Sequence, residues 1–367
     1  MNQANEQPAA PEIQCRASDG FGAWFSKANG SLVITTYQAG LVALVGWDGR
    51  QISVLLRHFD KPMGLAARGD QLAVVTRQGV VLLADSPRQA AEYPPECPGG
   101  YDSLYLPRAS YYTCDLLIHD VAYGEHDQLW IVNTRFSCLA TLSRKVSFQP
   151  RWQPPFISEL VPEDRCHLNG VAMDAGQPKF VTALGETNER DGWRAGKATG
   201  GVVIDVPTGE TVLHGLCMPH SPRWHDGMLW FLDSGKGNLC VVQPGHSHPT
   251  LVCTLPGYLR GLCFVGMHAL VGLSLIREKH TFGGLPIGED HKNLRCGVAV
   301  VDLRNGKMCG LLEFTSGCEE IYEVKFLPGV RRGMILNLED PLTRQAISAP
   351  GFAYWMRPRT TADDDAS

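Results

Sequence analysis

Short apolar runs that recur along the chain constrain its fold more than any other feature of the sequence. The runs are rich in Val, Leu, Ile and aromatic residues, and turn sequences such as DVPTGE (205–210) and DLRNGK (302–307) separate them. Apolar runs of this kind, punctuated by Gly, Asp, Asn and Pro, are typical of β-strands joined by tight turns. We therefore expect an all-β chain, and the 39 glycines and 24 prolines agree with a turn-rich fold.

The runs form groups of four that repeat with a period of about 50 residues. The first run of each group begins beside a Gly, Asp, Ser or Glu. These first runs are PMGLA (62–66), IHDVA (118–122), LNGVA (168–172), PHSPRW (219–224), LRGLCF (259–264) and IYEVKF (321–326). Four antiparallel strands at this period predict one blade of a β-propeller. We expect six blades, with seven as the alternative.

Strands from the two ends of the chain are expected to close the ring. SLVITTY (31–37) and the two runs after it resemble the second to fourth strands of a blade, and IYEVKF supplies a first strand. GMILNL (333–338) competes with SLVITTY for the second position, and the sequence leaves this choice open.

The chain divides into three parts on this reading. Residues 1–29 are expected to form an N-terminal arm with a short helix near 20–29, residues 30–356 a single propeller domain, and residues 357–367 a disordered tail. Four insertions are expected to be loops on the propeller. They are 87–113, 144–166, 184–199 and 276–295.

The repeat also predicts a site, because first strands line the central channel of a propeller and the residues before them gather at one mouth. The residues directly before the Gly, Asp, Ser or Glu position are Met63, His119, Asn169, His220, Arg260 and Tyr322. His167 and Glu320 stand two residues before the ring residues of their own runs. Residues far apart in sequence are therefore expected to meet around one axis.

Three of these residue types suggest metal chemistry. His119, His167 and His220 are predicted to bind a divalent metal such as Zn, Fe or Mn, with Glu320 as a fourth ligand or a general base. His167 is a second candidate catalytic residue, because imidazole also acts as a general base near neutral pH. Structural histidines that bond strand ends and trapped waters are the alternative.

Polar residues nearby are candidates for substrate binding. Asn169 is expected to orient the substrate, and Arg260, Arg223 and Arg135 to hold an anionic group. A carboxylate clamp between blades is the alternative role for these arginines.

Two further features lie close to the predicted ring. Asp164 and Arg165 stand just before His167 and are interpreted as an ion pair between blades, with a place beside the histidines in the site as the alternative. Trp193 and Arg194 lie in an insertion and are expected to be exposed recognition residues that cover the mouth.

Several of these segments resemble a family of uncharacterised, conserved bacterial proteins known as a domain of unknown function. The resemblance rests mainly on NTRFSCLA (133–140), EDRCHLNG (163–170) and MPHSPRW (218–224), and it extends from about residue 30 to 330. It implies a β-propeller-like fold and brings no established reaction with it.

Composition limits the kinds of partner and the cellular location that we expect for this chain. A net charge of −5 and scattered basic residues argue against a nucleic-acid partner, and no apolar stretch is long enough to span a membrane. The polar start of the chain and the 12 scattered cysteines favour a cytoplasmic protein with reduced thiols. The sequence does not indicate an oligomeric state.

Two functions follow from these features. The first is a metal-dependent enzyme that acts on a small, anionic substrate at the channel mouth. The second is a non-catalytic scaffold that binds a protein, peptide or glycan.

Overall fold

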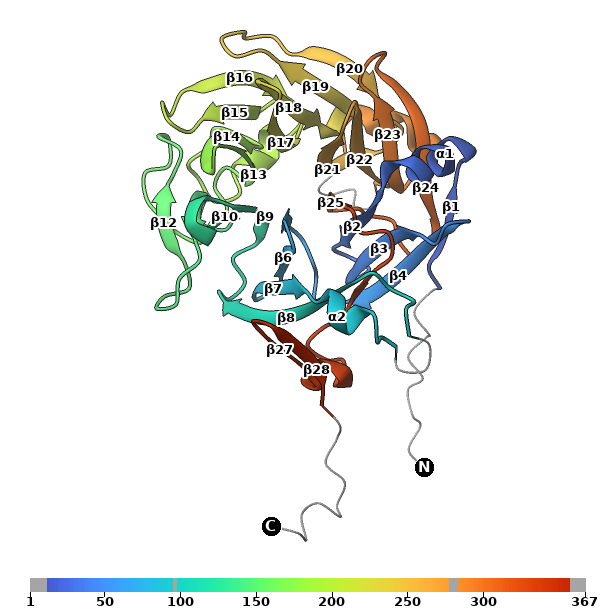
Figure 1. Ribbon diagram of the computed structural model, residues 1–367. Helices are drawn as coiled ribbons and strands as arrows, with labels where there is room; N and C mark the ends of the chain where they lie inside the picture. Colours follow the sequence, from blue (N-terminus) through green and yellow to red (C-terminus); the bar gives the residue numbers. More distant parts are fainter. Residues whose placement is uncertain (1–11, 95–97, 277–282, 357–367) are drawn as a thin grey trace, which may run out of the picture.

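In a computed structural model, which describes residues 12–94, 98–276 and 283–356, six β-sheets stand in a ring around a central axis (Figure 1). The chain is a six-bladed β-propeller, so the predicted fold class and the blade number are confirmed. The tail predicted at 357–367 lies outside the described residues.

Each blade is an antiparallel sheet whose first strand is innermost. Blade 1 consists of β25 (Glu323–Pro328), β2 (Gly30–Thr36), β3 (Leu41–Trp47) and β4 (Ile52–His58). Blade 2 consists of β5 (Leu65–Arg68), β6 (Gln71–Thr76), β7 (Gly79–Asp85) and β8 (Ser103–Tyr112). Blade 3 consists of β9 (Ile118–Tyr123), β10 (Leu129–Asn133), β11 (Cys138–Thr141) and β12 (Gln149–Trp152).

The other half of the ring repeats this order. Blade 4 consists of β13 (Leu168–Asp174), β14 (Gln177–Ala183), β15 (Gly201–Asp205) and β16 (Thr211–Leu216). Blade 5 consists of β17 (Pro219–His225), β18 (Met228–Asp233), β19 (Asn238–Val242) and β20 (Thr250–Thr254). Blade 6 consists of β21 (Tyr258–Val265), β22 (His268–Ser274), β23 (Gly297–Asp302) and β24 (Lys307–Ser316).

Blade 1 closes the ring by joining the two ends of the propeller. β25 pairs with β2 through six residue pairs, from Gly30 opposite Pro328 to Thr35 opposite Glu323. The competing run GMILNL contributes only β26 (Gly333–Ile335), which pairs in parallel with β8 at the outer edge of blade 2. The closing register that the sequence left open is therefore settled in favour of SLVITTY.

Two of the segments predicted to be loops contain outer strands. β8 lies within 87–113 and β12 within 144–166. Their sequences, SLYLPRASYY and QPRW, include proline and many polar residues, and their outer parts are exposed or half-buried. Edge strands of this kind lack the continuous apolar run by which inner strands are recognised, which explains the error.

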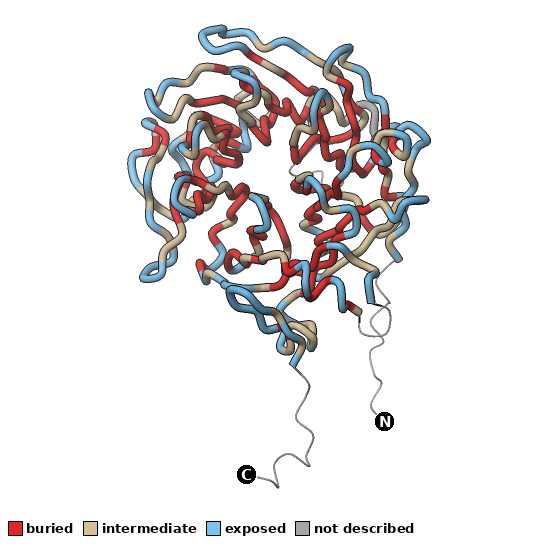
Figure 2. The backbone as a smooth tube through the Cα atoms, in the orientation of Figure 1, coloured by how far each residue is buried: buried red, intermediate tan, exposed pale blue. Residues whose placement is uncertain are grey.

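The hydrophobic core is divided among the junctions between neighbouring blades. Val33 and Leu44 of blade 1 pack with Leu72 and Val74 of blade 2, for example, and comparable clusters fill the other junctions. Figure 2 shows this arrangement as buried inner backbone with exposed turns at the periphery. Each blade therefore buries its faces only against its neighbours, and the stability of every blade depends on a closed ring.

Helix α1 (Asp19–Ala28) covers the junction of blades 6 and 1. Its N-cap, Ser18, accepts a hydrogen bond from the backbone N–H of Phe21, and Asn29 ends the helix in a left-handed conformation. Phe21 and Phe25 lie one turn apart, so both enter the core of this junction. β1 (Gln14–Ala17) adds a fifth strand to blade 6 beside β24.

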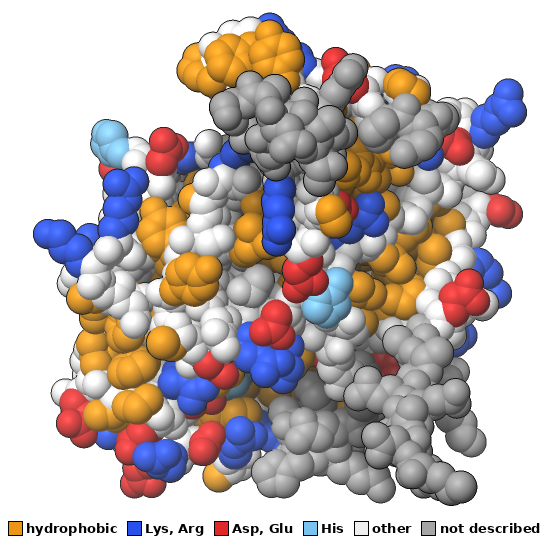
Figure 3. Space-filling model, turned by 90° about the horizontal axis from the view of Figure 1, so that it is seen from below, with side chains coloured by type: hydrophobic (Ala, Val, Ile, Leu, Met, Phe, Trp, Pro, Cys, Tyr) orange, Lys and Arg blue, Asp and Glu red, His pale blue; other side chains and the backbone are white. Residues whose placement is uncertain are grey.

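The remaining elements lie at the rim. α2 (Pro87–Ala90) and the hairpin of β27 (Ala346–Ala349) and β28 (Phe352–Trp355) cover blade 2. On the side of the molecule in Figure 3, basic and acidic side chains alternate with hydrophobic ones. None of the helices in the described ranges is long and apolar enough to cross a membrane. The other short helices are α3 (Trp193–Gly196), η1 (Glu125–Asp127), η2 (Ser234–Lys236), η3 (Pro286–Asn293) and η4 (Pro341–Arg344).

Candidate functional site

A repeated local geometry brings the chain to the channel mouth. In four blades the residue two before the ring residue is left-handed, with φ between 48° and 53°. These residues are Lys61, Leu117, His167 and Met218. Blades 3, 4, 5 and 6 each contain one extra residue at or next to the ring position, which shifts the register of β9, β13, β17 and β21. Such β-bulges turn side chains out of the regular alternation, and here they occur where the ring residues face the channel.

The small residues of the sequence repeat lie where neighbouring inner strands approach most closely. A Cβ atom added to Gly64 would stand 3.0 Å from Cα of Asp120, and one added to Gly261 would stand 2.7 Å from the backbone nitrogen of Val324. Glycine at these positions therefore lets adjacent first strands converge on the channel.

A pocket of about 300 Å³ opens at this mouth of the channel. Four of the predicted site residues line it, namely His119, His167, Arg260 and Glu320. They come from blades 3, 4 and 6 and from the segment before β25, so the repeat did identify side chains that meet across the ring. The other lining residues include Tyr37, Asp164, Trp193, Arg194, Tyr258 and Tyr322.

Asp164 and His167 form the best-defined polar pair in the pocket. Nδ1 of His167 lies 2.7 Å from Oδ2 of Asp164, and the indole nitrogen of Trp193 donates to the same oxygen at 3.2 Å. The Trp193 ring also packs on the His167 ring, with centroids 4.3 Å apart. Because Nδ1 donates its hydrogen to the carboxylate, Nε2 of a neutral His167 carries the lone pair.

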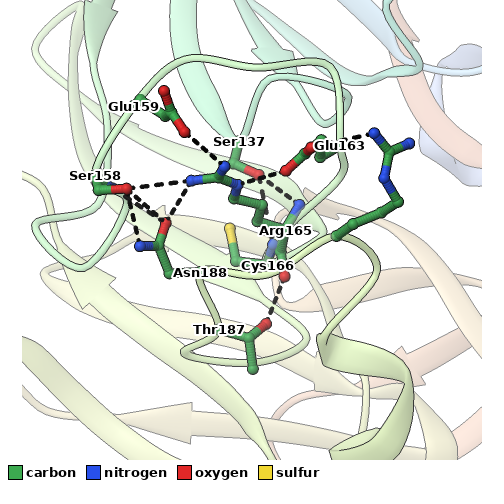
Figure 4. Close-up of polar contacts among 9 residues, drawn as sticks. Ser137, Ser158, Glu159, Glu163, Arg165, Cys166, Thr187 and Asn188 are labelled. Carbon is green, nitrogen blue, oxygen red and sulfur yellow. Dashed lines mark hydrogen bonds and ion pairs between the residues drawn. The ribbon is translucent and has the colours of Figure 1, made fainter.

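The segment that carries this pair is anchored from outside the pocket by Arg165 (Figure 4). Its guanidinium donates to Glu163 and Glu159, each at 2.9 Å, and to Asn188 at 2.9 Å. Arg165 does not pair with Asp164, so the ion pair expected between them is wrong. Consecutive residues here point to opposite sides, which leaves Asp164 free to bond His167.

His119 and His220 share a backbone contact that fixes their tautomer. Nδ1 of His119 lies 2.8 Å from the carbonyl oxygen of Leu117, and Nδ1 of His220 lies 2.8 Å from that of Met218. A carbonyl oxygen only accepts hydrogen bonds, so Nδ1 carries the hydrogen in both rings and Nε2 is the acceptor. Both carbonyls belong to the left-handed residues two positions earlier, so one blade geometry sets both tautomers.

Burial keeps these two imidazoles uncharged. Desolvation, followed by the nearby His167, holds the pKa of His119 well below its usual value of 6.5. Desolvation, followed by the charge of Arg260, lowers the pKa of His220 in the same way. His220 is not a lining residue of the pocket and packs edge-on against Tyr258, with ring centroids 5.7 Å apart.

Arg260 supplies a buried positive charge at the pocket. Nη1 donates to Oε1 of Glu320 at 2.7 Å. The guanidinium carbon lies 4.8 Å from the ring centroid of Tyr322 and 5.5 Å from that of Tyr258. Glu320, predicted as a metal ligand or base, therefore holds Arg260 in place between the two aromatic rings.

Three predicted substrate-binding residues lie outside the lining of this pocket. Asn169 donates to the carbonyl of Pro219 at 3.0 Å and accepts from Thr182 at 2.7 Å, so it joins blades 4 and 5. Arg135 bonds the backbone and side chain of Asp115.

Arg223 belongs to an ion-pair network deeper in the channel. It donates to Asp120 at 3.0 Å and to Glu323 at 2.6 Å, and Lys325 lies 3.1 Å from Glu323. The network connects the first strands of blades 5, 3 and 1. Arg223 thus has the clamp role that the sequence left as its alternative.

The described residues contain no preformed metal centre. Within the described parts of the chain, no three His, Cys, Asp or Glu side chains are grouped closely enough to hold a metal ion. The metal predicted on His119, His167 and His220 gains no support from this arrangement and stays a prediction.

Sequence reasoning gave no catalytic or binding role to several residues of the pocket. Tyr322 occupies a ring position, and Tyr258 stands two residues before the ring residue Arg260, so the alignment that found the histidines also contained these two tyrosines.

Trp193 is buried rather than exposed, because it packs on His167 and is covered in turn by Arg194, 4.4 Å above its ring. The expectation of an exposed tryptophan at the mouth is therefore wrong.

The fold and the pocket define a six-bladed β-propeller with a polar pocket at one mouth of its channel. Residues 19–336 match a protein family described as a domain of unknown function, DUF4915, and the chain belongs to this family. The resemblance predicted from the sequence motifs, to an uncharacterised conserved family, is confirmed. A search of curated proteins found no match.

Two solved structures match this chain at low sequence identity. A chain from the crystal structure of a nidogen–laminin complex matches with a TM-score of 0.50 and 10% identity, over 82% of this chain and 99% of that chain. A protein of unknown function from Bacteroides caccae matches with a TM-score of 0.48 and 10% identity, over 82% and 99%. At such identity the first likeness shows the fold alone.

Proposed function

We propose that this propeller is an enzyme that acts on a small molecule by general acid–base catalysis in the mouth pocket. The observation that carries the proposal is the Asp164–His167 pair, a histidine bonded through Nδ1 to a carboxylate inside a cavity. A carboxylate in this position orients the imidazole and stabilises the imidazolium that forms when Nε2 takes a proton.

The other pocket residues fit the same chemistry. Arg260 stabilises negative charge that develops on the substrate once a proton leaves, and Glu320 holds the guanidinium in position. The neutral His119, whose ring lies edge-on to that of His167 with centroids 4.7 Å apart, accepts a hydrogen bond from the substrate. The aromatic rings of Trp193 and Tyr322 exclude water from the reacting groups.

The proposal includes a cytoplasmic location. Several cysteines are buried thiols, among them Cys138, Cys166 and Cys217. Reduced, buried thiols are usual in the cytoplasm.

Turnover of a compound panel by the full chain tests the proposal. The protein is purified without a histidine tag, dialysed against EDTA, and incubated in D₂O with small organic acids, alcohols and esters. NMR then records product formation and exchange of C–H for C–D. His167→Gln is expected to lower the rate by about 10²-fold or more, and Asp164→Asn to lower it less.

The control is His246→Gln, which replaces an exposed histidine in a turn of blade 5 and should leave the rate unchanged. A folded His167→Gln variant with the wild-type rate would contradict the proposal. Loss of turnover after EDTA, restored by Zn, Fe or Mn, would support the metal-dependent reaction instead. Binding of a peptide or glycan without any turnover would favour the non-catalytic scaffold.

A further inference from the structure

Buried polar atoms without a hydrogen-bond partner gather at the mouth pocket. Three lining residues contribute such atoms, namely Oδ1 of Asp164, Nε of Arg260 and the hydroxyl of Tyr322. Each of these residues is more than nine-tenths buried. Native proteins rarely leave such atoms unpaired, because a buried polar atom without a partner loses its hydrogen bonds to water, so a cluster of them indicates groups that await a ligand.

One side of the pocket presents hydrogen-bond donors beside a positive charge. Nη1 of Arg260 is already bonded to Glu320, whereas Nε is unpaired, and the hydroxyl of Tyr322 belongs to the ring that packs on the same guanidinium. A planar carboxylate matches the remaining edge of a guanidinium. Glu320 offsets part of the charge of Arg260, which makes the dianionic phosphate a poorer fit than a singly charged carboxylate.

Other lining residues of the pocket present acceptors. Oδ1 of Asp164 is an unpaired carboxylate oxygen. His119 offers Nε2 as an acceptor, because its Nδ1–H is held by the carbonyl of Leu117. Acceptors of this kind are satisfied by hydroxyl groups.

We infer that the pocket binds a small hydroxylated carboxylic acid, with its carboxylate on Arg260 Nε and the Tyr322 hydroxyl and its hydroxyl groups toward Asp164 and His119. The inference rests on the proposed function, since it names the substrate class of that same site. A cavity of about 300 Å³ suits a molecule of this size.

Calorimetric titration of the full chain tests this inference independently of turnover. The probes are lactate, tartrate, gluconate and glucuronate. Each acid is compared with a matched compound without hydroxyl groups, such as hexanoate for gluconate, and with a matched polyol without a carboxylate, such as sorbitol. At least one hydroxy acid is expected to bind about tenfold or more tightly than both of its matched compounds.

Variants then test the groups that would bind the carboxylate. Tyr322→Phe removes one donor and should weaken binding of the acid several-fold without changing binding of the polyol. Arg260→Gln alone leaves Glu320 unpaired, so the double variant Arg260→Gln/Glu320→Gln, which removes both charges, guards against misfolding. It should weaken binding of the acid by about tenfold or more. Arg16→Gln, at an exposed surface arginine, is the matched control.

The outcomes separate this inference from the proposed function. Binding of a hydroxy acid without turnover contradicts the enzyme and leaves the inference standing. Turnover of a neutral compound contradicts the inference and leaves the enzyme standing. The inference is overturned if no hydroxy acid binds more tightly than its matched compounds, or if the folded double variant binds the acid as tightly as the wild type.

Discussion

Histidine occurs at or near the ring in three blades, and each occurrence has a different environment. His167 is bonded to a carboxylate, His119 and His220 to backbone carbonyls. The carboxylate of Asp164 orients the ring of His167 through Nδ1, whereas desolvation keeps the other two rings neutral. Similar positions in the repeat therefore differ in the group that bonds Nδ1, which is a carboxylate at one histidine and a backbone carbonyl at the other two.

The neutral histidines make stability sensitive to acid. Above pH 6.5 both the folded and the unfolded chain hold His220 neutral, so it adds no pH dependence. Below that value the unfolded chain binds a proton that the folded chain excludes, so the free energy of unfolding falls as the pH falls, by up to about 1.4 kcal/mol per pH unit. His220→Gln should therefore lose less stability than the wild type between pH 7 and 5.5.

Urea unfolding at pH 7, 6.5 and 5.5 measures this difference. His246→Gln serves as the control, because this exposed side chain should leave the slope unchanged. Equal slopes for wild type and His220→Gln would show that His220 is not held neutral in the folded chain.

The sequence predicted which residues line the pocket better than it predicted the hydrogen-bond and ion-pair partners of those residues. The repeat placed His119, His167, Arg260 and Glu320 at one mouth because it fixes which backbone positions reach the axis. It does not fix the bonds of each side chain. Asn169 and Arg223 come from the same repeat, yet their nearest partners are a backbone carbonyl of the next blade and two buried carboxylates.

At the scale of elements, the inner strands were predictable and the outer strands only in part. Inner strands are buried on both faces and read as apolar runs beside a small residue. β8 and β12 face solvent and contain proline, so their sequences resemble loops. The left-handed residues and bulges that precede the ring are local backbone features with no fixed sequence signature, and they escaped prediction.

The close approach of inner strands predicts a large effect at Gly261. This glycine has φ of +78°, and a Cβ there would meet backbone atoms of Glu323 and Val324 in the next blade at 2.7–3.0 Å. Gly261→Ala should lower the free energy of unfolding by about 2–4 kcal/mol, because neither backbone can move away. Urea denaturation followed by tryptophan fluorescence measures the change.

Gly266 gives a matched control within the same blade. It has φ of +53°, and no atom lies within 4 Å of an added Cβ. Gly266→Ala should cost only the backbone penalty of about 1 kcal/mol. Equal losses for the two variants would contradict the assignment of a steric role to Gly261.

At the scale of the whole molecule, six blades are held in a circle by one closing sheet and one buried network. The number of first strands in the sequence predicted the blade number, since each blade needs one. The network of Arg223 with Asp120 and Glu323 was not predictable, because its members are 100 or more residues apart in sequence.

Loss of Arg223 should weaken the entire ring. Arg223→Met keeps an unbranched apolar stem but removes the cation that two buried carboxylates share, so the free energy of unfolding should fall by about 3–5 kcal/mol. Guanidinium chloride unfolding gives the value. The exposed Arg16, paired with Glu313 on the surface, is the control, and Arg16→Met should change stability by about 0–1 kcal/mol.

A double variant checks the cause. Lys325 still pairs with Glu323 when Arg223 is lost, so Arg223→Met/Asp120→Asn removes the carboxylate charge that is left unpaired and should recover part of the lost stability. Failure to recover any stability would indicate that packing of the arginine, rather than its charge, holds the blades together.

The left-handed turns and bulges have a consequence for how relatives of this chain diverge. Blades 3, 4 and 5 each bring a residue of their own to the pocket through a left-handed residue followed by a bulge. A substitution at one such position changes one part of the pocket lining, while the strand pairing in the other blades stays the same. Selectivity can thus evolve one sheet at a time on a scaffold whose architecture stays unchanged.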